Sequence, residues 1–168
     1  AVLRTFFVSA VARVRQPGIK VDHVPILEGP QGIGKSTAID NLFAPWTTDE
    51  LPELHSKDAS LQVQGIWCIE LSELDGLSRS EVNAVKSFLS RRTDRFRPPY
   101  GTRPVEAPRQ CVFIGSVNDD AYLQDATGNR RFLPIQCGSI DVEGLARDRD
   151  QLFAEAAELY SAGEPWWI

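Results

Sequence analysis

The residues best placed for chemistry in this sequence form a glycine-rich stretch near its amino terminus. The stretch reads Gly29-Pro30-Gln31-Gly32-Ile33-Gly34-Lys35-Ser36, with Thr37 next in line, and it fits the pattern G-x-x-x-x-G-K-S. Glycines let the backbone wrap closely around phosphates, so that consecutive N–H groups point at the anion. Lys35 would reach the β- and γ-phosphates of a nucleotide, and Ser36 would offer its hydroxyl to Mg²⁺. The stretch therefore predicts a nucleotide-binding loop over residues 29–37.

The elements on either side of this loop are the ones that a phosphate-binding loop requires. An apolar run at residues 24–27 suits a buried strand, and residues 37–43 suit the start of a helix. The helix would add the positive end of its dipole at the place where the phosphates bind. The alternative is a glycine-rich turn that matches the pattern by chance, and it explains neither the strand in front nor the helix behind.

Acidic residues follow a second apolar run, residues 66–69, which we predict to be another buried strand. Glu70 comes directly after this run, where a carboxylate would hold Mg²⁺ through water or orient the attacking water. Glu73 is a second candidate for this chemistry, whereas Asp75 is better explained as part of an acidic loop. Glu70 is therefore the predicted partner of Ser36 at the metal, and Glu70 and Glu73 are both candidate catalytic residues.

Two further polar features follow later in the chain. Asn118 ends a third predicted strand, residues 111–117, where its amide would hold the attacking water or sense the γ-phosphate. Arg130 and Arg131 stand on a Gly-Asn turn that leads into a fourth predicted strand, residues 132–135. We expect this turn at the nucleotide-bearing edge of the sheet, too far round to reach the phosphates of its own chain. The pair is thus predicted to be an arginine finger for a neighbouring subunit, with a merely exposed pair as the alternative.

Residues 91–109 form the basic segment of the chain. They hold six of its 18 positive residues, set against two acids, and Pro98-Pro99-Tyr100-Gly101 is a strong turn signal. Two short arms around a tight turn, with arginines on both sides and an aromatic near the tip, suit contact with a phosphate backbone and base stacking. The candidate DNA-binding residues are Arg95, Arg97, Tyr100 and Arg103. A solubilising surface loop is the alternative.

Composition limits the remaining possibilities. The 168 residues suit one domain, and 42% hydrophobic with 24% charged residues is ordinary for a globular protein. A net charge of −5 argues against a globally basic nucleic-acid binder, although local patches can still bind. No apolar run reaches 18 residues, so no membrane span is expected.

Three cysteines in apolar runs, Cys68, Cys111 and Cys137, suit free thiols in a reducing cytoplasm. The absence of methionine and the apolar carboxyl end suggest a piece of a longer protein.

Helical spacing of apolar residues predicts a helix over residues 1–14 and a last helix from Leu145 to about Gly163. The mixed segment after Trp46 suggests a short strand followed by a short helix over residues 57–62. Ser78 and Glu81 form a capping box that opens another helix. On that helix Lys86 falls outside the apolar stripe and is expected to be solvated.

The order of these features resembles the superfamily 3 helicases, and more closely the virulence-associated protein E family of phages and prophages. The passages that carry the resemblance are Ile26–Thr37, Ile69–Leu74, Arg97–Gly101 and Thr127–Phe132. The loop alone is common to many functions, whereas the four passages in this order are specific. The resemblance extends from about Pro17 to Trp167.

This resemblance implies an α/β fold of the P-loop NTPase class, an AAA+-like three-layer domain with a five-stranded parallel sheet and an inserted basic β-hairpin. It also implies ATP and Mg²⁺ as cofactors, a homo-hexameric ring, and ATP-driven movement along single-stranded DNA, with a primase or another replication domain in the full-length protein. Two departures from the family pattern matter. Glu70 is followed by Leu71 rather than by a second acid, and the hairpin tip offers arginines and Tyr100 instead of a lysine or histidine.

Two other classes of protein remain open. A nucleotide-gated DNA-binding or scaffold module would bind DNA without turning over ATP. A P-loop kinase for a small molecule would need an acceptor pocket and a lid, and it gives no reason for the basic hairpin.

Overall fold

A five-stranded parallel sheet lies at the centre of the computed structural model, which describes residues 1–50, 58–72, 79–118 and 129–168. The strand order is β2-β3-β6-β1-β7, and every neighbouring pair is parallel. The strands are β1 (Val24–Glu28), β2 (Thr47–Thr48), β3 (Cys68–Leu71), β6 (Val112–Val117) and β7 (Phe132–Gln136). The predicted parallel sheet is confirmed, and its fifth strand is the short one expected after Trp46.

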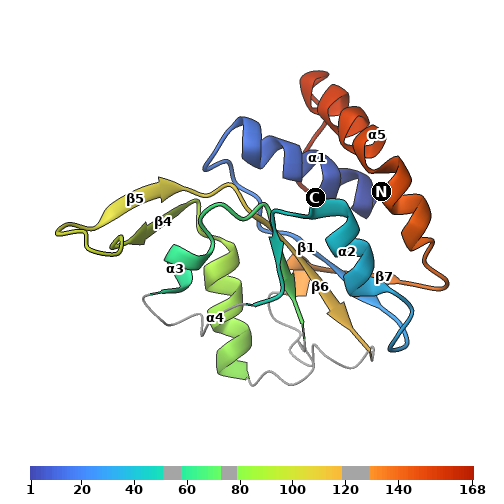
Figure 1. Ribbon diagram of the computed structural model, residues 1–168, viewed down its shortest axis with the longest axis horizontal. Coiled ribbons are helices and arrows are strands. Elements are labelled where there is room, and N and C mark those ends of the chain that lie inside the picture. The colour runs from blue at the N-terminus through green and yellow to red at the C-terminus, as the bar shows by residue number, and fades with distance from the viewer. Residues whose placement is uncertain (51–57, 73–78, 119–128) are drawn as a thin grey trace.

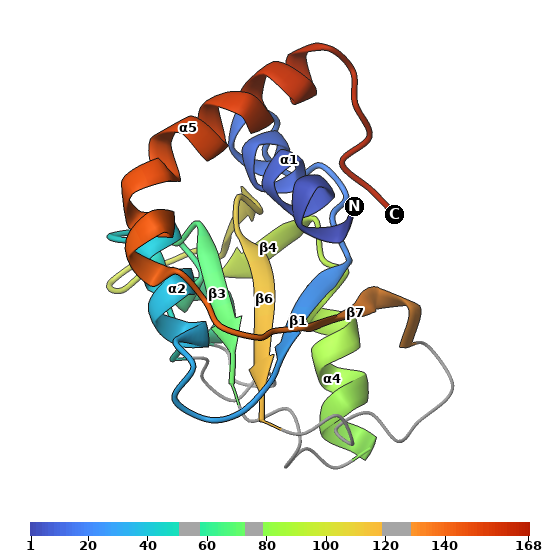
Figure 2. The same ribbon diagram turned by 90° about the vertical axis from the view of Figure 1, so that its right-hand side faces the viewer.

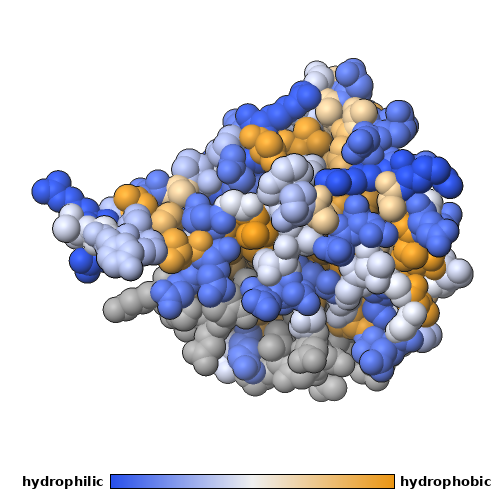
Figure 3. Space-filling model, viewed as in Figure 1, coloured by the Kyte–Doolittle hydropathy of each residue, from blue (hydrophilic) through white to orange (hydrophobic). Residues whose placement is uncertain are grey.

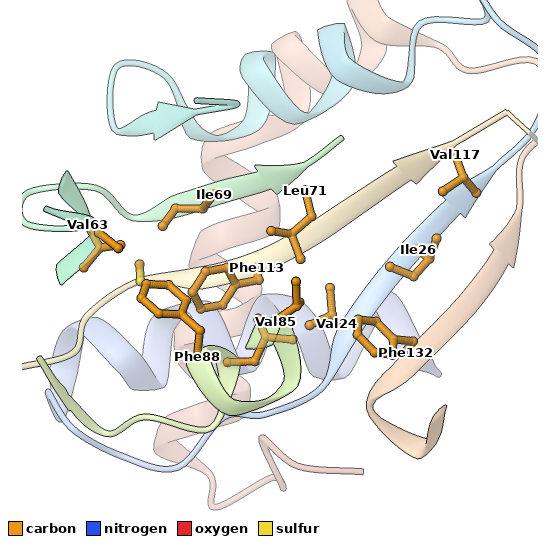
Figure 4. Packing of buried hydrophobic residues seen from close by; sticks show 13 residues of the cluster. Val24, Ile26, Val63, Ile69, Leu71, Val85, Phe88, Phe113, Val117 and Phe132 are labelled. Carbon is orange, nitrogen blue, oxygen red and sulfur yellow. The ribbon is translucent and has the colours of Figure 1, made fainter. Parts of the chain in front are cut away.

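Helices cover both faces of this sheet and make the domain three-layered (Figures 1 and 2). One face carries α1 (Val2–Arg15), α2 (Lys35–Phe43) and α5 (Val142–Ser161), and the other carries α3 (Ala59–Gln62) and α4 (Arg79–Leu89). Side chains of a strand alternate between faces, so Val112 and Ile114 join one core cluster while Phe113 joins the other. Figure 4 shows this second cluster, in which Phe88 of α4 packs edge-to-face on Phe113.

Aromatic rings fill the layer between the sheet and α1, α2 and α5. Phe43 makes edge-on contacts with Phe6, Trp67 and Phe153, with ring centroids 5.2 to 6.0 Å apart. The indole N–H of Trp67 donates to the carbonyl of Ala10 at 2.9 Å. This packing fixes α1 and α5 against α2, which begins at the glycine-rich loop, and so holds the loop on a rigid base.

The basic segment is an antiparallel hairpin of β4 (Thr93–Phe96) and β5 (Val105–Pro108), separate from the main sheet. It projects beyond the body of the domain, and most of its surface is hydrophilic (Figures 1 and 3). Tyr100 lies at its tip, fully exposed, with a φ of 63° that the tight turn imposes. The predicted hairpin is thus confirmed.

One arginine of the basic segment does not belong to this surface. Arg109 is only 2% exposed, and its guanidinium forms a bidentate ion pair with the buried Asp94. It also donates to the carbonyl of Phe88 and lies 4.4 Å from the centre of that ring. A buried charge needs such partners, so Arg109 anchors the hairpin to α4 and to the start of β6.

Lys86 is buried at 8% exposure, so the prediction of a solvated lysine is wrong. Residues four apart share a helix face, so Lys86 lies on the side of Val82, which is buried in α4. The element boundaries shift slightly as well, because α2 begins at Lys35 and Glu70 lies inside β3 rather than after it. Within the described ranges, no helix is long and apolar enough to cross a membrane.

Candidate nucleotide site

The glycine-rich loop leaves the carboxyl end of β1 and runs directly into α2. Gly34, the residue that caps the amino terminus of α2, has a φ of 95°, which a residue with a side chain rarely adopts. A Cβ atom added to Gly29 would lie 2.8 Å from the carbonyl oxygen of Cys137. Glycine is therefore required at both positions, at one by the backbone conformation and at the other by close packing.

Lys35 joins the start of the loop to the end of β6. Its Nζ lies 2.6 Å from the carbonyl oxygen of Gly29, 2.9 Å from that of Pro30 and 3.2 Å from Oδ1 of Asn118. The lysine is 7% exposed, so its charge is held by these three oxygens inside the loop. The structure thus brings together two predicted site residues, Lys35 and Asn118, that lie 83 positions apart.

Glu70 receives two hydroxyl groups on one carboxylate oxygen. Ser36 donates to Oε1 at 2.7 Å, and Ser116 of β6 donates to the same oxygen at 2.5 Å. Glu70 lies on the α2 face of β3 because it alternates with Ile69 and Leu71, which face α4. A serine hydroxyl beside a carboxylate is an all-oxygen ligand set, which fits Mg²⁺.

Sequence reasoning missed Ser116. The sequence feature that could have identified it is its position two residues before Asn118, because residues two apart lie on the same side of an extended strand. Serine inside an apolar strand looks like a tolerated small residue, because its partner Glu70 comes from another strand. Only the pairing of β3 with β6, with Leu71 opposite Gly115, brings the hydroxyl and the carboxylate together.

A cavity of about 720 Å³ opens over these side chains. Ligand pockets for small molecules have this size. The loop and the start of α2 line it with Gln31, Gly32, Gly34, Lys35, Ser36 and Thr37, and the neighbouring strand ends add Ser72, Ser116, Val117 and Asn118. In parallel sheets ligands bind outside the carboxyl ends of the strands, which is where this cavity lies. Pro30 and Ile33 of the predicted loop do not line it and face a second pocket instead.

The arginine pair lies elsewhere, and its predicted location is wrong. Arg130 and Arg131 end the short 3-10 helix η2 (Asn129–Arg131), and the next residue, Phe132, pairs with Val24 at the start of β1. The glycine-rich loop follows the other end of β1, roughly 13 Å away at the rise of a strand. The pair therefore lies at the sheet end opposite the cavity. Arg130 is exposed, whereas the Nε of Arg131 lies 3.6 Å from a carboxylate oxygen of Asp22.

The hairpin residues are also distant from the cavity. β5 leads into the start of β6, whereas Ser116 and Asn118 are at its other end. Arg95, Arg97, Tyr100 and Arg103 are all exposed, and Arg97 donates to the carbonyl of Gly101 at 2.6 Å, which ties the tip together. Glu73 and Asp75 lie outside the described residues.

Comparison with known proteins agrees with this fold. The family model of the virulence-associated protein E-like domain matches residues 1–168. A search of curated proteins gave no match. Among solved structures, the apo structure of the NrS-1 C-terminal region (305-718) is similar, with a TM-score of 0.60, 18% identity and 90% of this chain covered. The A form of the same region gives a TM-score of 0.59 at 17% identity, again with 90% of this chain covered.

At such identities the likeness shows the fold alone. The chain covers 41% and 40% of these two solved chains, so it spans about two fifths of their length.

Proposed function

Because the chain belongs to the virulence-associated protein E-like family, we propose that it is an ATP-hydrolysing motor domain that acts on single-stranded DNA in phage or mobile-element replication. The observation that carries the proposal is that Lys35, Ser36 and Asn118 line one cavity, while Glu70 accepts a hydrogen bond from Ser36 and lines a neighbouring pocket that shares Ser36 and Thr37. These residues come from the loop and from two neighbouring strands, and their chemistry is that of a nucleotide triphosphate site.

We assign the domain to the P-loop NTPases of AAA+ type, close to the superfamily 3 helicases. The assignment rests on the central position of β1 between β6 and β7, with the glycine-rich loop leading straight into α2.

Each residue of the site has a role in this proposal. Lys35 turns from the loop carbonyls to the β- and γ-phosphates of ATP. Ser36 and Glu70 hold Mg²⁺, directly and through water, and the metal supplies charge neutralisation at the phosphates. Asn118 holds the attacking water or the γ-phosphate oxygen. Glu73 is the second carboxylate that orients the water.

The hairpin is the DNA contact of this motor. Its exposed arginines bind phosphates and Tyr100 stacks on a base, with a rigid root at the Arg109–Asp94 ion pair. The connection of β5 to β6 links this contact to Asn118 at the far end of the same strand.

Arg130 and Arg131 act between subunits of a hexameric ring. At the sheet end opposite the cavity they are too far from the phosphates of their own chain, so a neighbouring subunit is the site they serve. Arg130 is exposed and is the better finger, while Arg131 is held near Asp22. A primase or another replication domain is the expected partner in the full-length protein.

Substitution of Lys35 tests the nucleotide site. Lys35→Ala removes the one side-chain charge that the loop offers to the phosphates. We expect weaker nucleotide binding, measured by calorimetry, and loss of ATP hydrolysis, measured by phosphate release. Lys20→Ala, an exposed lysine upstream of β1, is the matched control and should retain both. ATP hydrolysis by Lys35→Ala at the wild-type rate would refute the proposal.

A further inference from the structure

Two exposed arginines lie at the base of the hairpin, at the end opposite its tip. Arg91 and Arg92, here called the root patch, stand between α4 and β4. Within the described residues, no carboxylate forms an ion pair with either of them. In a chain with a net charge of −5, two adjacent arginines without an acidic partner make a local surface that attracts anions.

Neighbouring groups hold both arginines in place. The guanidinium of Arg91 lies 4.9 Å from the centre of the Phe88 ring, which is 1% exposed and belongs to the core. The Nε of Arg92 donates to the carbonyl of Gly18 at 2.7 Å, and the carbonyl of Arg92 accepts from the amide of Arg109 at 2.9 Å. An arginine that is already held loses less conformational entropy when its other N–H groups bind a phosphate. The root patch is therefore preorganised for an anion.

The loop between α1 and β1 fixes the root patch to the body of the domain. The amide of Gly18 donates to the carbonyl of Arg109 at 2.9 Å, and the buried Arg13 of α1 donates to the same carbonyl at 3.3 Å. A Cβ atom added to Gly18 would lie 3.4 Å from the carbonyl oxygen of Arg92 and 3.4 Å from Cβ of Pro108. The loop thus packs tightly on both strands where the hairpin leaves the domain (Figure 1).

A stretch of lower net charge separates the root patch from the hairpin tip. Arg95 lies directly opposite Glu106, and both side chains are exposed on one face of the hairpin. From Arg92 to Arg97 the chain advances roughly 17 Å at the rise of a strand. This is about five nucleotides of a stacked single strand at 3.4 Å each. A short oligonucleotide can therefore reach one end of the hairpin, whereas a longer one can reach both.

We propose that the root patch is a second binding site for single-stranded DNA, which contacts phosphates of the same strand that the hairpin tip binds. The inference rests on the proposed function, because it takes the tip as the first DNA contact. The planar guanidinium groups of Arg91 and Arg92 suit contacts with phosphate oxygens, and they stand on the same arm as the tip. An acidic surface of a second copy of this chain is the competing partner.

Binding of short and long oligothymidylates, of about 4 and about 20 nucleotides, tests the root patch. Fluorescence anisotropy measures the affinity over a range of salt concentrations. In a variant with Arg91→Ala and Arg92→Ala, we expect the affinity for the long strand to fall about 10-fold or more. Its salt slope should fall by about 1.4, because each phosphate contact of a single strand contributes about 0.7. The short strand still has the tip, so its affinity should fall less than about 2-fold.

Two further variants separate a phosphate contact from a structural role. Arg4→Ala with Arg147→Ala is the matched control, because both arginines are exposed on α1 and α5 and the change of net charge is the same. It should bind both oligonucleotides as the wild-type protein does. Arg91→Lys with Arg92→Lys keeps the two positive charges and should retain most of the salt slope. Thermal unfolding checks that each variant folds.

The outcomes distinguish the root patch from the tip contact. If the alanine variant of the root patch binds the long strand as the control does, or loses both strands equally, the root patch is overturned while the proposed function stands. Unchanged DNA binding together with altered self-association in sedimentation would assign the patch to a second copy of the chain, and would also overturn it. A wild-type protein that binds neither oligonucleotide would contradict the proposed function and the root patch together.

Discussion

Two polar contacts between distant segments define the candidate site at the scale of single residues. Lys35 reaches Asn118, and Glu70 gathers the hydroxyls of Ser36 and Ser116 on one oxygen. Both hydroxyls bond Oε1, so neither of them occupies Oε2. This arrangement fixes the carboxylate while leaving it able to bind a metal-coordinated water.

Substitutions at Glu70 and Ser116 should separate metal chemistry from positioning. We expect Glu70→Gln to bind ATP but to lose turnover about 100-fold, because an amide neither holds the metal's water as well nor polarises it. Ser116→Ala removes one of two donors to Glu70, so a loss of roughly 10-fold with a higher Mg²⁺ requirement is expected. Ser116→Thr, which keeps the hydroxyl, should restore most of the rate.

The measurement is steady-state ATP hydrolysis as a function of Mg²⁺ concentration. Ser9→Ala is the matched control, because Ser9 is buried, donates to the carbonyl of Phe6 within α1 and does not line the cavity. Wild-type turnover in Glu70→Gln would contradict the role of Glu70. A Ser116→Ala rate that falls equally at all Mg²⁺ concentrations, with no recovery in Ser116→Thr, would contradict the role of Ser116.

At the scale of elements, the hairpin should behave as a DNA contact with a fixed root. Replacing Arg95, Arg97 and Arg103 by alanine should weaken single-stranded DNA binding and reduce its salt slope by about 2, because fewer counterions are released. Tyr100→Ala should cost about 1–3 kcal/mol if a base stacks on it. Fluorescence anisotropy across a range of salt concentrations measures both effects.

A charge-matched control shows whether the position of these arginines matters. Arg4, Arg15 and Arg147 are exposed on α1 and α5, and their triple alanine variant carries the same change of net charge. We expect it to bind DNA with the wild-type slope. If the two triple variants behave alike, the DNA contact is not the hairpin.

The sequence predicts an element correctly where a local pattern, such as an apolar run or a turn signal, is enough to specify it. The apolar runs around Ile69 and Phe113 specify buried strands, and the turn before Tyr100 specifies a hairpin. Lys86 was assigned to solvent because it falls outside the apolar stripe of its helix, and Arg109 was counted only as one of the arginines of the basic segment. Arg109 is buried because Asp94, 15 positions away, faces it across the hairpin.

At the scale of the whole molecule, the order and direction of the strands decide which residues can meet. The sequence suggests that Arg130 is close to the nucleotide, since it follows Asn118 by only twelve positions. Both β6 and β7 run parallel to β1, so Asn118 after β6 and Arg130 before β7 lie at opposite ends of the sheet. The residue types around Arg130 do not reveal this position, whereas the direction of the strands does.

Mixing inactive variants tests the shared site that follows from this geometry. A variant with Arg130→Ala and Arg131→Ala should bind ATP but hydrolyse it about 10³-fold or more slowly, as for a lost arginine finger. Added to Lys35→Ala protein, it should regain activity, since some interfaces then pair an intact loop with an intact arginine. Wild-type turnover per monomer should also fall on dilution. A mixture that assembles yet stays inactive would exclude the arginine pair as a shared finger.

The stimulation of ATP hydrolysis by single-stranded DNA tests the central claim most directly. Phosphate release by the wild-type protein is measured with saturating ATP and Mg²⁺, with increasing concentrations of an unstructured oligonucleotide, and with Lys35→Ala as the background. A motor domain predicts a rate that rises with DNA to a plateau. DNA binding with no ATP turnover would indicate a scaffold module, and turnover indifferent to DNA would indicate an enzyme acting on a small molecule; either result would contradict the account.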